Sequence, residues 1–379
     1  MLKILLVVGA RPNFMKVAPI LFAMRRHPDE FDPLLVHTGQ HYDGKMSDVF
    51  FDDLGLPVPD VFLGVGSGSH AVQTAHAMIA FEKVLLDHRP DWVVVVGDVN
   101  STIACALDAV KLGIDVAHVE AGLRSRDRSM PEEINRILTD SISSLLLTPS
   151  LDANANLVAE GIGEEKIRFV GNVMIDSLRR IDAYSSQTNA LEVLGVPCRG
   201  YGLITLHRPS NVDDPSHLQS LLNAFERIQN LIPLVFPVHP RTRKMMTECG
   251  LMDRVSRMDG IKLMDPLGYK DFVQFERNAL MVLTDSGGVQ EETTVFQVPC
   301  LTIRNNTERP VTVDCGSNTV VGTDENAIVH EAMRIIAGRG KVGDIPEGWD
   351  GHAAERIVAV FRQLDRKAPQ LTLAQTESR

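Results

Sequence analysis

Short, continuously apolar runs alternate with helix-like segments along most of this chain. The first half contains LKILLVVG, DPLLVHTG, DWVVVVGD, DVAHVEAG and SLLLTP, and the second half contains YGLITLHR, PLVFPVHP, IKLMDP, LMVLTDSGG and VPCLTIRN. Strands that are buried on both faces read as continuous apolar runs, whereas strands with one wet face alternate. With helices between them, these runs predict an α/β fold of doubly wound parallel sheets.

The length and one break in the pattern predict two domains. The chain has 379 residues, more than one typical hydrophobic core holds. A polar stretch around AYSSQTNA separates the two sets of runs. We therefore expect an N-terminal Rossmann-like domain at residues 1–172 and a C-terminal one at 173–352. The helical pattern at about 353–366 can pack back on either domain, the N-terminal one included.

Charge and cysteine usage exclude several classes of protein. With 38 basic and 49 acidic residues the net charge is −11, which argues against nonspecific binding to nucleic acid or anionic membranes. The five cysteines are odd in number and form no C-x-x-C, which argues against a disulfide framework and a zinc site. The N-terminal apolar run is too short for a signal peptide, and no run is long enough to span a membrane. We expect a cytoplasmic protein without a metal ion.

Polar residues follow nearly every predicted strand. Seven strands end in Gly-Ala-Arg, His-Thr-Gly, Gly-Asp, Glu-Ala-Gly, His-Arg, His-Pro-Arg or Asp-Ser-Gly-Gly. Ligands of open parallel sheets bind beyond the carboxyl ends of the strands. One such ending means little, but seven in two sheets predict a cleft that both domains line.

Two of these endings are glycine turns that open a helix. VVGARPNFMK carries Arg11 and Lys16, and TDSGGVQEE carries Ser286 and Gly287. Free N–H groups at a helix N-terminus suit phosphate, so both turns are candidate anion sites. The alternatives are an ordinary turn with exposed cations in the first case, and a helix N-cap made by Asp285 or Ser286 in the second.

Acids gather at two further strand ends. Asp98 follows a strand, and Asn100 or Ser101 is available to cap the next helix, which leaves Asp98 free for chemistry. Glu120 follows V-A-H-V in HVEAGLRSRDRSMPEEINR, where burial is expected. Glu132 lies three residues after Ser129, a capping-box spacing, with Arg136 one turn further on. The arginines of this stretch either clamp a phosphate or pair with the acids.

Two His-Arg pairs mark strand ends of the second half. The residues are His207 with Arg208, and His239 with Arg241. A single histidine at such a position usually only makes hydrogen bonds to neighbouring polar groups and has no functional role. Two pairs expected at one cleft favour substrate binding.

The motifs together resemble the non-hydrolysing UDP-N-acetylglucosamine 2-epimerases. The resemblance rests on GARPNFMK, HTGQHYD, GDVNST, HVEAGLRS, MPEEINR, GNVMID, TLHR, PVHPRTR, DSGGVQEE and RNNTERP, and it extends to about residue 325. It implies the GT-B architecture, with two Rossmann-like domains and an active site in the cleft between them. It also implies a UDP-sugar substrate, no cofactor and a homodimer.

The resemblance implies epimerisation at C2 by elimination of UDP to a bound glycal, followed by re-addition. Carboxylates have to remove a proton on one face of C2 and return one on the other. The catalytic residues implied are Asp98, Glu120, Glu132, His207 and Lys16. The substrate-binding residues implied are Arg11, Phe272, Ser286, Gly287, Glu292, Arg208, His239 and Arg309, with Glu292 on the ribose and Phe272 at the uracil. Which carboxylate is acid and which is base stays open.

Three positions depart from the usual family pattern. Asn13 stands where many members have glutamate, and the His-Arg motif continues with Pro209-Ser210-Asn211 where Arg-Glu-Asn or similar is common. Asp43 stands where the substrate-activated bacterial members usually carry another polar residue. These departures leave the exact sugar and activation by a second UDP-sugar open. Several motifs also resemble 2-epimerases of UDP-2,3-diacetamido-2,3-dideoxy-glucuronic acid, the second candidate activity. A GT-B glycosyltransferase is a third, although it has no need of three acids around one sugar carbon.

Overall fold

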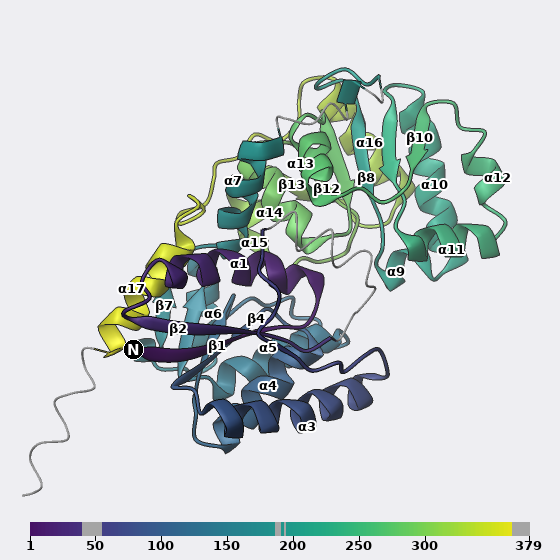
Figure 1. The fold of residues 1–379 in the computed structure, drawn as a ribbon. Helices are drawn as coiled ribbons and strands as arrows, with labels where there is room; N and C mark the ends of the chain where they lie inside the picture. The colour runs from purple at the N-terminus through teal and green to yellow at the C-terminus, as the bar shows by residue number, and fades with distance from the viewer. Residues whose placement is uncertain (40–54, 186–190, 193–194, 366–379) are drawn as a thin grey trace, which may run out of the picture. The chain divides into compact units, whose positions relative to one another are not determined.

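The chain divides into two compact units in a computed structural model that describes residues 1–39, 55–185, 191–192 and 195–365 (Figure 1). Unit 1 consists of Met1–Ser177 and the segment that begins at Glu347, and unit 2 is Leu178–Pro346. The division falls inside helix α7 (Val173–Ser185), which starts directly after residue 172. Asp43 and the end of the HTGQHYD motif lie outside the described residues.

Unit 1 is built on a seven-stranded parallel sheet with the order β3-β2-β1-β4-β5-β6-β7. The strands are β1 (Leu2–Val8), β2 (Phe31–His37), β3 (Val61–Phe62), β4 (Trp92–Val96), β5 (Asp115–Val119), β6 (Leu145–Thr148) and β7 (Ile167–Phe169). The chain order reverses between β1 and β4. In such sheets this switch point leaves a crevice beyond the carboxyl ends of the two strands.

Helices cover both faces of this sheet, as the continuous apolar runs require. The helices are α1 (Arg11–Arg25), α3 (His70–His88), α4 (Asn100–Lys111), α5 (Pro131–Ile142), α6 (Leu151–Ala159) and α17 (Ala353–Asp365). Figure 1 shows α1 and α17 on one face and α3 and α4 on the other. The core beneath α3 and α4 joins Leu5, Val7, Val93 and Val95 to Phe81 and Ala106.

The C-terminal segment is tied to unit 1 by buried contacts. Trp349 is fully buried, and its indole Nε1 donates to the Pro149 carbonyl at 3.0 Å. The Arg356 guanidinium donates to the Val170 carbonyl at 2.6 Å. Asp176 caps the start of α17 by accepting from the backbone of Ala354 at 2.7 Å. Burial raises the pKa of Asp176 to about 6 despite these hydrogen bonds.

Unit 2 contains a six-stranded parallel sheet with the order β10-β9-β8-β11-β12-β13. Its strands are β8 (Gly202–Thr205), β9 (Leu234–Pro237), β10 (Ile261–Met264), β11 (Met281–Thr284), β12 (Cys300–Thr302) and β13 (Asn318–Val320). Its helices are α9 (Pro209–Val212), α10 (Pro215–Gln229), α11 (Pro240–Glu248), α12 (Met252–Val255), α13 (Tyr269–Arg277), α14 (Gly287–Phe296), α15 (Pro310–Asp314) and α16 (Glu325–Ile336). Its switch point lies between β8 and β11.

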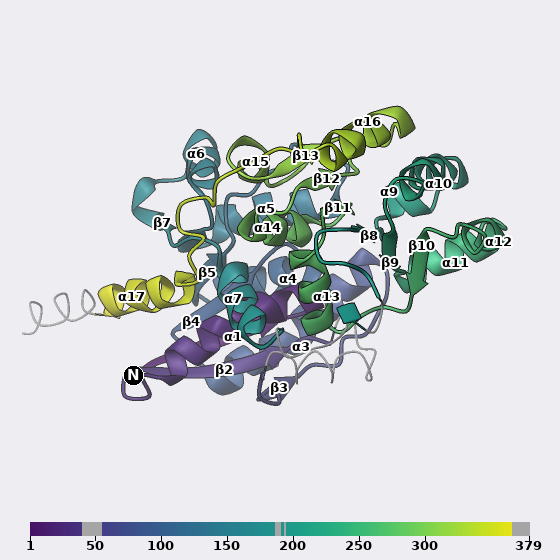
Figure 2. The same ribbon diagram turned by 90° about the horizontal axis from the view of Figure 1, so that it is seen from above.

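Successive residues of β8, β9 and β11 enter different cores, which is the two-residue period of a strand. Ile204 packs with α10 and α16, whereas Leu203 packs with Phe275 of α13 and Val289 of α14. The helices α10 and α16 lie side by side (Figure 2). The predicted fold class of two doubly wound parallel sheets is therefore confirmed.

The sequence pattern missed the edge strands β3, β7 and β13, each of two or three residues. Such segments are too short to carry a period, so only pairing with a neighbouring strand defines them. The glycine-rich stretch is a loop over residues 64–69, as expected, and Ser69 caps α3, which begins at His70.

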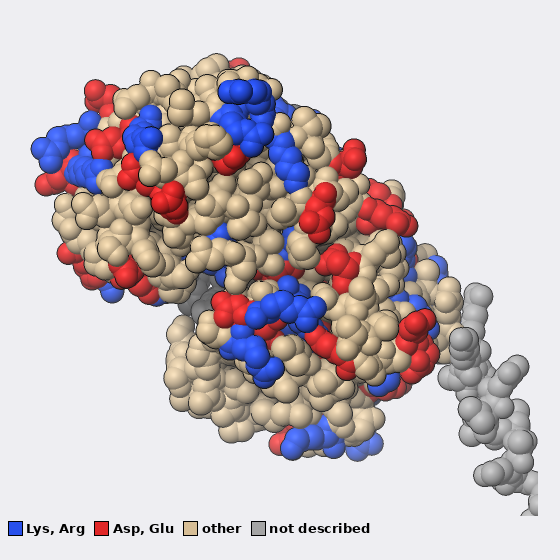
Figure 3. Space-filling model, turned by 180° about the vertical axis from the view of Figure 1, so that it is seen from behind, with Lys and Arg blue, Asp and Glu red and all other residues tan. Residues whose placement is uncertain are grey.

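Basic and acidic side chains are interspersed on the visible face of each unit (Figure 3). No helix in the described part of the chain has the length and apolar character needed to cross a membrane. Within the same residues, no group of three or more His, Cys, Asp or Glu side chains is arranged to hold a metal ion.

Candidate active site

The first glycine turn of unit 1 is fixed to its neighbouring strand by Asn13. The side-chain oxygen of Asn13 accepts from the backbone N–H of Gly9 and Ala10 at 3.1 and 2.9 Å, and its nitrogen donates to the Val96 carbonyl at 3.0 Å. Asn13 therefore joins the ends of β1 and β4 at the switch point. This role gives a structural reason for one departure from the family pattern. The side chain of Arg11, which begins α1, lies outside the described residues.

Lys16 and Glu120 form a buried ion pair at this switch point. Glu120 is 5% exposed and has a φ of 72°, in the left-handed region that a residue with a Cβ seldom adopts. Backbone strain of this kind persists only where the surroundings enforce it, and it gathers at functional sites. A Cβ on Gly97 would lie 3.0 Å from Lys16 Nζ and 3.4 Å from Glu120 Oε2, so the pair needs glycine there.

Asp98 follows Gly97 in the chain and is held by Arg136. The Arg136 guanidinium donates to Asp98 Oδ2 at 2.5 Å and to Glu133 Oε2 at 2.6 Å. Asp98 stays 27% exposed and can reach a ligand. The residue at the N-cap of α4 is Val99, with no side-chain cap, so the expected capping by Asn100 or Ser101 is wrong. Asn100 instead donates to Gln73 Oε1 at 2.9 Å.

Glu133 is a structural carboxylate. It is 1% exposed and accepts from the backbone N–H groups of Ser125 and Arg126, each at 2.9 Å, as well as from Arg136. Burial would raise its pKa, but the hydrogen bonds from Ser125 and the guanidinium of Arg136 outweigh burial and hold the pKa below its ordinary value. The acid therefore remains ionised and fixes the start of α5.

The expected capping box at Glu132 is wrong. α5 has Met130 at its N-cap, without a side-chain cap, and the Ser129 hydroxyl donates to Asp127 Oδ1 at 2.6 Å instead. That local turn uses the Ser129 hydroxyl, so the helix begins after it. Arg136 pairs with Glu133 rather than with Glu132. Glu132 is partly exposed and has no partner in the described part of the chain.

A buried histidine supports the strand end that carries Asp98. His118 Nδ1 lies 2.6 Å from Asp140 Oδ1, and its Nε2 lies 2.8 Å from the Gly97 carbonyl. Its two ring nitrogens therefore bridge the Asp140 carboxylate and the end of the loop after β4. Burial would raise the pKa of Asp140, but His118 and Arg124 hold it below its ordinary value. The ring thereby fixes the turn at Gly97.

In unit 2, Asp285 organises the switch point. It accepts from the backbone N–H of Arg208 at 2.9 Å and of His207 at 3.1 Å, and it pairs with His207 Nδ1 at 3.1 Å. Burial would raise the pKa of Asp285, but the His207 contacts keep it lowered. The His207 side chain is 42% exposed, and its ring centroid lies 5.6 Å from that of His239. The two His-Arg strand ends are therefore neighbours, as expected.

Three arginines surround the start of α14. Glu308 pairs with Arg304 at 2.8 Å, Arg309 at 3.2 Å and Arg208 at 3.3 Å, and Arg309 also pairs with Glu291 at 2.9 Å. Three guanidinium groups therefore surround the Glu308 carboxylate. Burial would raise the pKa of Glu308, but the guanidinium of Arg309 and those of its neighbours keep it far below its ordinary value.

The N-terminus of α14 opens beside this cluster. Ser286 is the N-cap residue, and its hydroxyl makes no cap hydrogen bond. A Cβ on Gly287 would lie 2.7 Å from Glu308 Oε1, so the backbone approaches the cluster more closely than another residue would allow. The guanidinium groups and the helix N-terminus together suit a diphosphate.

Glu292 and Phe272 flank this region from α14 and α13. Glu292 is buried and accepts a hydrogen bond from the Tyr269 hydroxyl. Burial raises the pKa of Glu292 to about 7. Phe272 packs against the core between α13 and the sheet.

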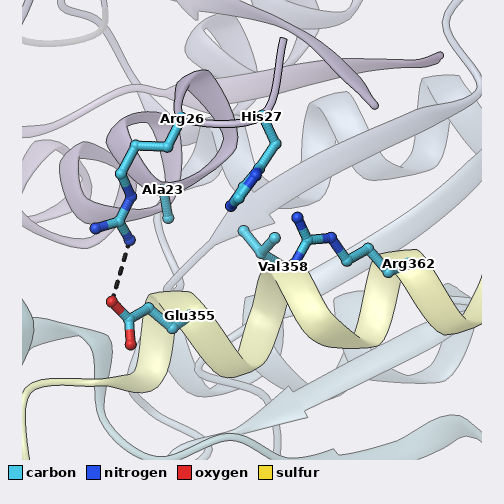
Figure 4. A pocket seen from close by; sticks show the side chains of 6 residues that line it. All are labelled: Ala23, Arg26, His27, Glu355, Val358 and Arg362. Carbon is cyan, nitrogen blue, oxygen red and sulfur yellow. Dashed lines mark hydrogen bonds and ion pairs between the residues drawn. The ribbon is translucent and has the colours of Figure 1, made fainter. Parts of the chain in front are cut away.

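Two surface pockets lie in unit 1 beside other side chains. One of about 450 Å³ lies between α1 and α17, where Arg26 donates to Glu355 at 3.1 Å (Figure 4). The other, of about 420 Å³, is lined by Arg124, Arg126 and Arg128 together with Glu133 and Glu160. Neither pocket is lined by a predicted catalytic residue.

Several of the predicted residues therefore lie together at the strand ends of each unit. Lys16, Glu120 and Asp98 gather in unit 1, while His207, Arg208 and His239 gather at the strand ends of unit 2, where Arg208 shares Glu308 with Arg309. The sequence motifs do not identify the buried partners that hold these residues, which are His118, Asp140, Glu133, Asp285, Glu308, Arg304 and Tyr269. Proximity to a motif was the available signal for several of them, because Glu308 precedes Arg309 and His118 lies in the HVEAG stretch.

Two Rossmann-like units with charged clusters at their switch points define a protein of the GT-B class. The sequence profile of the UDP-N-acetylglucosamine 2-epimerase family matches residues 23–362. A UDP-N-acetylglucosamine 2-epimerase homolog of Methanococcus maripaludis is 44% identical over 96% of this chain and 100% of its own. This chain belongs to the UDP-N-acetylglucosamine 2-epimerase family.

Two further proteins resemble it closely. The UDP-2,3-diacetamido-2,3-dideoxy-D-glucuronate 2-epimerase of Pseudomonas aeruginosa is 41% identical over 96% of this chain and 100% of its own. The crystal structure of Methanocaldococcus jannaschii UDP-GlcNAc 2-epimerase in complex with UDP-GlcNAc and UDP superposes with a TM-score of 0.88, at 42% identity, over 95% of this chain and 99% of that one.

Proposed function

We propose that the protein interconverts UDP-N-acetylglucosamine and UDP-N-acetylmannosamine. The observation that most supports this is the group of Lys16, Glu120 and Asp98 at one switch point, with Glu120 buried and its backbone strained. Epimerisation at C2 needs a proton removed from one face of the ring and another returned to the opposite face. It therefore needs more than one carboxyl group close to a single carbon.

The proposed reaction proceeds in two balanced steps. A carboxylate takes the C2 proton while the C1–O bond to UDP breaks, and the electron pair of that bond leaves with the diphosphate. The products of this step are UDP and a 2-acetamidoglycal. In the second step the diphosphate oxygen re-forms the bond to C1, and a carboxyl group on the opposite face delivers a proton to C2.

In unit 1, Glu120 and Asp98 are the carboxyl groups proposed for these transfers, with Glu132 as the third acid. Lys16 is proposed to hold the Glu120 carboxyl group in place through their buried ion pair. Arg136 is proposed to hold Asp98 in the same way. The C2 proton is not acidic, so departure of UDP leads and the carboxylates follow.

In unit 2, the diphosphate is proposed to bind at Ser286, Gly287, Arg309 and Arg208, with Arg11 of unit 1 assisting. Donors fixed before the reaction stabilise the developing charge on the leaving group without reorganising. His207 and His239 assist at the same strand ends. Glu292 is proposed to accept from the ribose, and Phe272 to contact the uracil.

We also propose that the protein works as a homodimer in the cytoplasm. Val72, Ile79 and Leu86 are 45%, 71% and 57% exposed. Their seven-residue spacing along α3 places them on one face of that helix. An apolar stripe of this kind favours association with a second copy. Light scattering after size-exclusion chromatography checks this, since a monomer at micromolar concentration contradicts it.

Proton NMR of UDP-N-acetylglucosamine with the enzyme in D₂O tests the activity. Deuterium at C2 together with the manno product is the expected result. Asp98→Asn should abolish both signals while leaving UDP binding intact. The absence of both deuterium exchange and the manno product, with or without a second UDP-sugar as activator, would refute the proposal.

The Pseudomonas relative supports a second candidate substrate, UDP-2,3-diacetamido-2,3-dideoxy-glucuronic acid, because its identity to this chain is close to that of the archaeal relative. The same NMR experiment with that compound separates the two. Exchange at C2 with the diacetamido sugar alone would support the same mechanism and would assign that sugar, not UDP-N-acetylglucosamine, as the substrate. Release of UDP only when an acceptor is added would indicate a glycosyltransferase instead.

A further inference from the structure

The pocket beside α5 and the end of α6 belongs to neither switch point. It has a volume of about 420 Å³, and Arg124, Arg126 and Arg128 in its lining come from the loop between β5 and α5. Ile137 of α5 and Ile162, which follows α6, add apolar walls. Pockets that bind small molecules have volumes of roughly 300–1,000 Å³ and combine apolar walls with a few polar groups. This pocket has the size and the mixed lining of such a site.

The two carboxylates in the lining of this pocket already have charged partners. Arg124 donates to both oxygens of Glu160, at 2.8 and 2.7 Å, so this acid and this arginine neutralise each other. Glu133 accepts from two backbone N–H groups and from the guanidinium of Arg136. Neither acid pairs with the side chain of another arginine of the pocket.

Arg126 and Arg128 therefore line the pocket without a carboxylate partner in the described part of the chain. Arg126 makes one side-chain hydrogen bond there, from Nη2 to the neutral Oδ1 of Asn156 at 2.6 Å. Arg128 is exposed and makes no hydrogen bond or ion pair with the described residues. Guanidinium groups match phosphate with paired hydrogen bonds, so two such groups at one pocket favour a phosphate-bearing ligand.

The other surface pocket, between α1 and α17, has a similar volume but no such cations (Figure 4). Arg26 pairs with Glu355 at 3.1 Å, and Arg362 pairs with Glu30 at 2.6 Å. Each guanidinium in its lining is thus neutralised by a carboxylate. The two pockets differ in charge rather than in size.

Arg126 is also held in place before any ligand binds. Its φ is 61°, in the left-handed region, and its backbone N–H donates to Glu133 Oε1 at 2.9 Å. Asn156, which holds the guanidinium, is itself fixed because it donates to the Gly122 carbonyl at 2.9 Å. Backbone strain of this kind gathers at functional sites, and a group fixed in advance loses less entropy when a ligand binds.

We propose that this pocket binds the phosphate group of a small molecule, with Arg126 and Arg128 as the donors and Ile137 and Ile162 against the rest of the ligand. The site is distinct from the diphosphate site proposed in unit 2. The inference therefore goes beyond the proposed function and does not depend on it.

Calorimetric titration of the whole protein with inorganic pyrophosphate tests the proposal. The parent should show two classes of site, one in this pocket and one at the diphosphate site proposed in unit 2. Arg126→Gln and Arg128→Gln should each weaken binding at one class by at least about tenfold, because each removes a hydrogen bond between charged groups. The other class should not change.

Arg89→Gln is the matched control. Arg89 is an exposed arginine of unit 1 outside the pocket, and its φ of 46° is left-handed like that of Arg126. This variant should bind pyrophosphate like the parent. Thermal unfolding shows whether the variants fold, and the exposure of Arg128 makes Arg128→Gln the one least able to disturb the fold.

The outcomes separate this inference from the proposed function. Binding that is unchanged in both pocket variants, or equally weakened in Arg89→Gln, would overturn the inference and leave the proposed function as it stands. A single class of site that is lost in Arg128→Gln would support the inference and contradict the diphosphate site of unit 2. Vesicles of phosphatidylglycerol provide a second arm. If they bind through Arg128 while pyrophosphate does not bind, the ligand is a lipid headgroup and the small-molecule assignment is overturned.

Discussion

Glu132 and Glu133 are adjacent acids to which the structure gives opposite roles. Glu133 accepts from two backbone N–H groups and from Arg136, whereas Glu132 is partly exposed and has no partner in the described residues. We predict that Glu133→Gln destabilises unit 1 and that Glu132→Gln does not. The two variants make the same chemical change one residue apart, so each is the control for the other.

The size of the effect follows from the contacts. The side-chain amide of the Glu133→Gln variant would place an NH₂ group against donors, and Arg136 would lose one partner of its buried pair. Breaking a buried pair in this way costs about 3–5 kcal/mol of unfolding free energy. At about 2–4 °C per kcal/mol for a unit of this size, the melting temperature should fall by roughly 6–20 °C. Glu132→Gln should stay within about 0.5 kcal/mol of the parent, as surface substitutions do.

Tryptophan fluorescence is the assay, since both tryptophans, Trp92 and Trp349, belong to unit 1. The pKa of Glu133 is lowered in the folded state, so its stabilisation is present above its ordinary pKa of 4.5 and disappears as the pH falls through the folded-state value. The melting temperatures of the parent and of Glu133→Gln should therefore converge at acidic pH. Turnover should be lost in Glu132→Gln, by at least about a hundredfold. Equal melting of Glu133→Gln and the parent at pH 7 would refute the assignment.

Three other predictions test the remaining sites. Glu120→Gln should bind UDP like the parent by calorimetry and lose turnover by orders of magnitude in the D₂O assay, whereas activity within a few-fold of the parent would exclude Glu120 from proton transfer. Gly287→Ala should weaken UDP binding at least about tenfold, because the new Cβ would lie 2.7 Å from Glu308 Oε1, and unchanged affinity would mean that the diphosphate binds elsewhere. Trp349→Ala should lower the free energy of unfolding by about 3–5 kcal/mol, because it leaves a cavity and removes the hydrogen bond to the Pro149 carbonyl. Urea unfolding followed by circular dichroism measures this, and a smaller decrease would show that the C-terminal segment adds little stability.

The sequence by itself determined the fold class and most strand ends. Strands buried on both faces have to be continuously apolar, and that composition is visible without coordinates. Parallel strands also bring their carboxyl ends to one edge of a sheet, so Lys16, Asp98 and Glu120 could be expected together. The short strands β3, β7 and β13 could not be found this way, because two or three residues carry no period.

Only the tertiary structure decided which polar groups are partners. Sequence spacing favoured Glu132 as the capping acid, yet Glu133 is the buried one, because the Ser129 hydroxyl binds Asp127 and the helix begins after it. The ion pair of Arg136 with Asp98 joins a helix to a distant strand end, and no local pattern predicts it. Hydrogen bonds and buried charges depend on distances of a few tenths of an ångström between distant segments, and packing of the whole unit sets those distances.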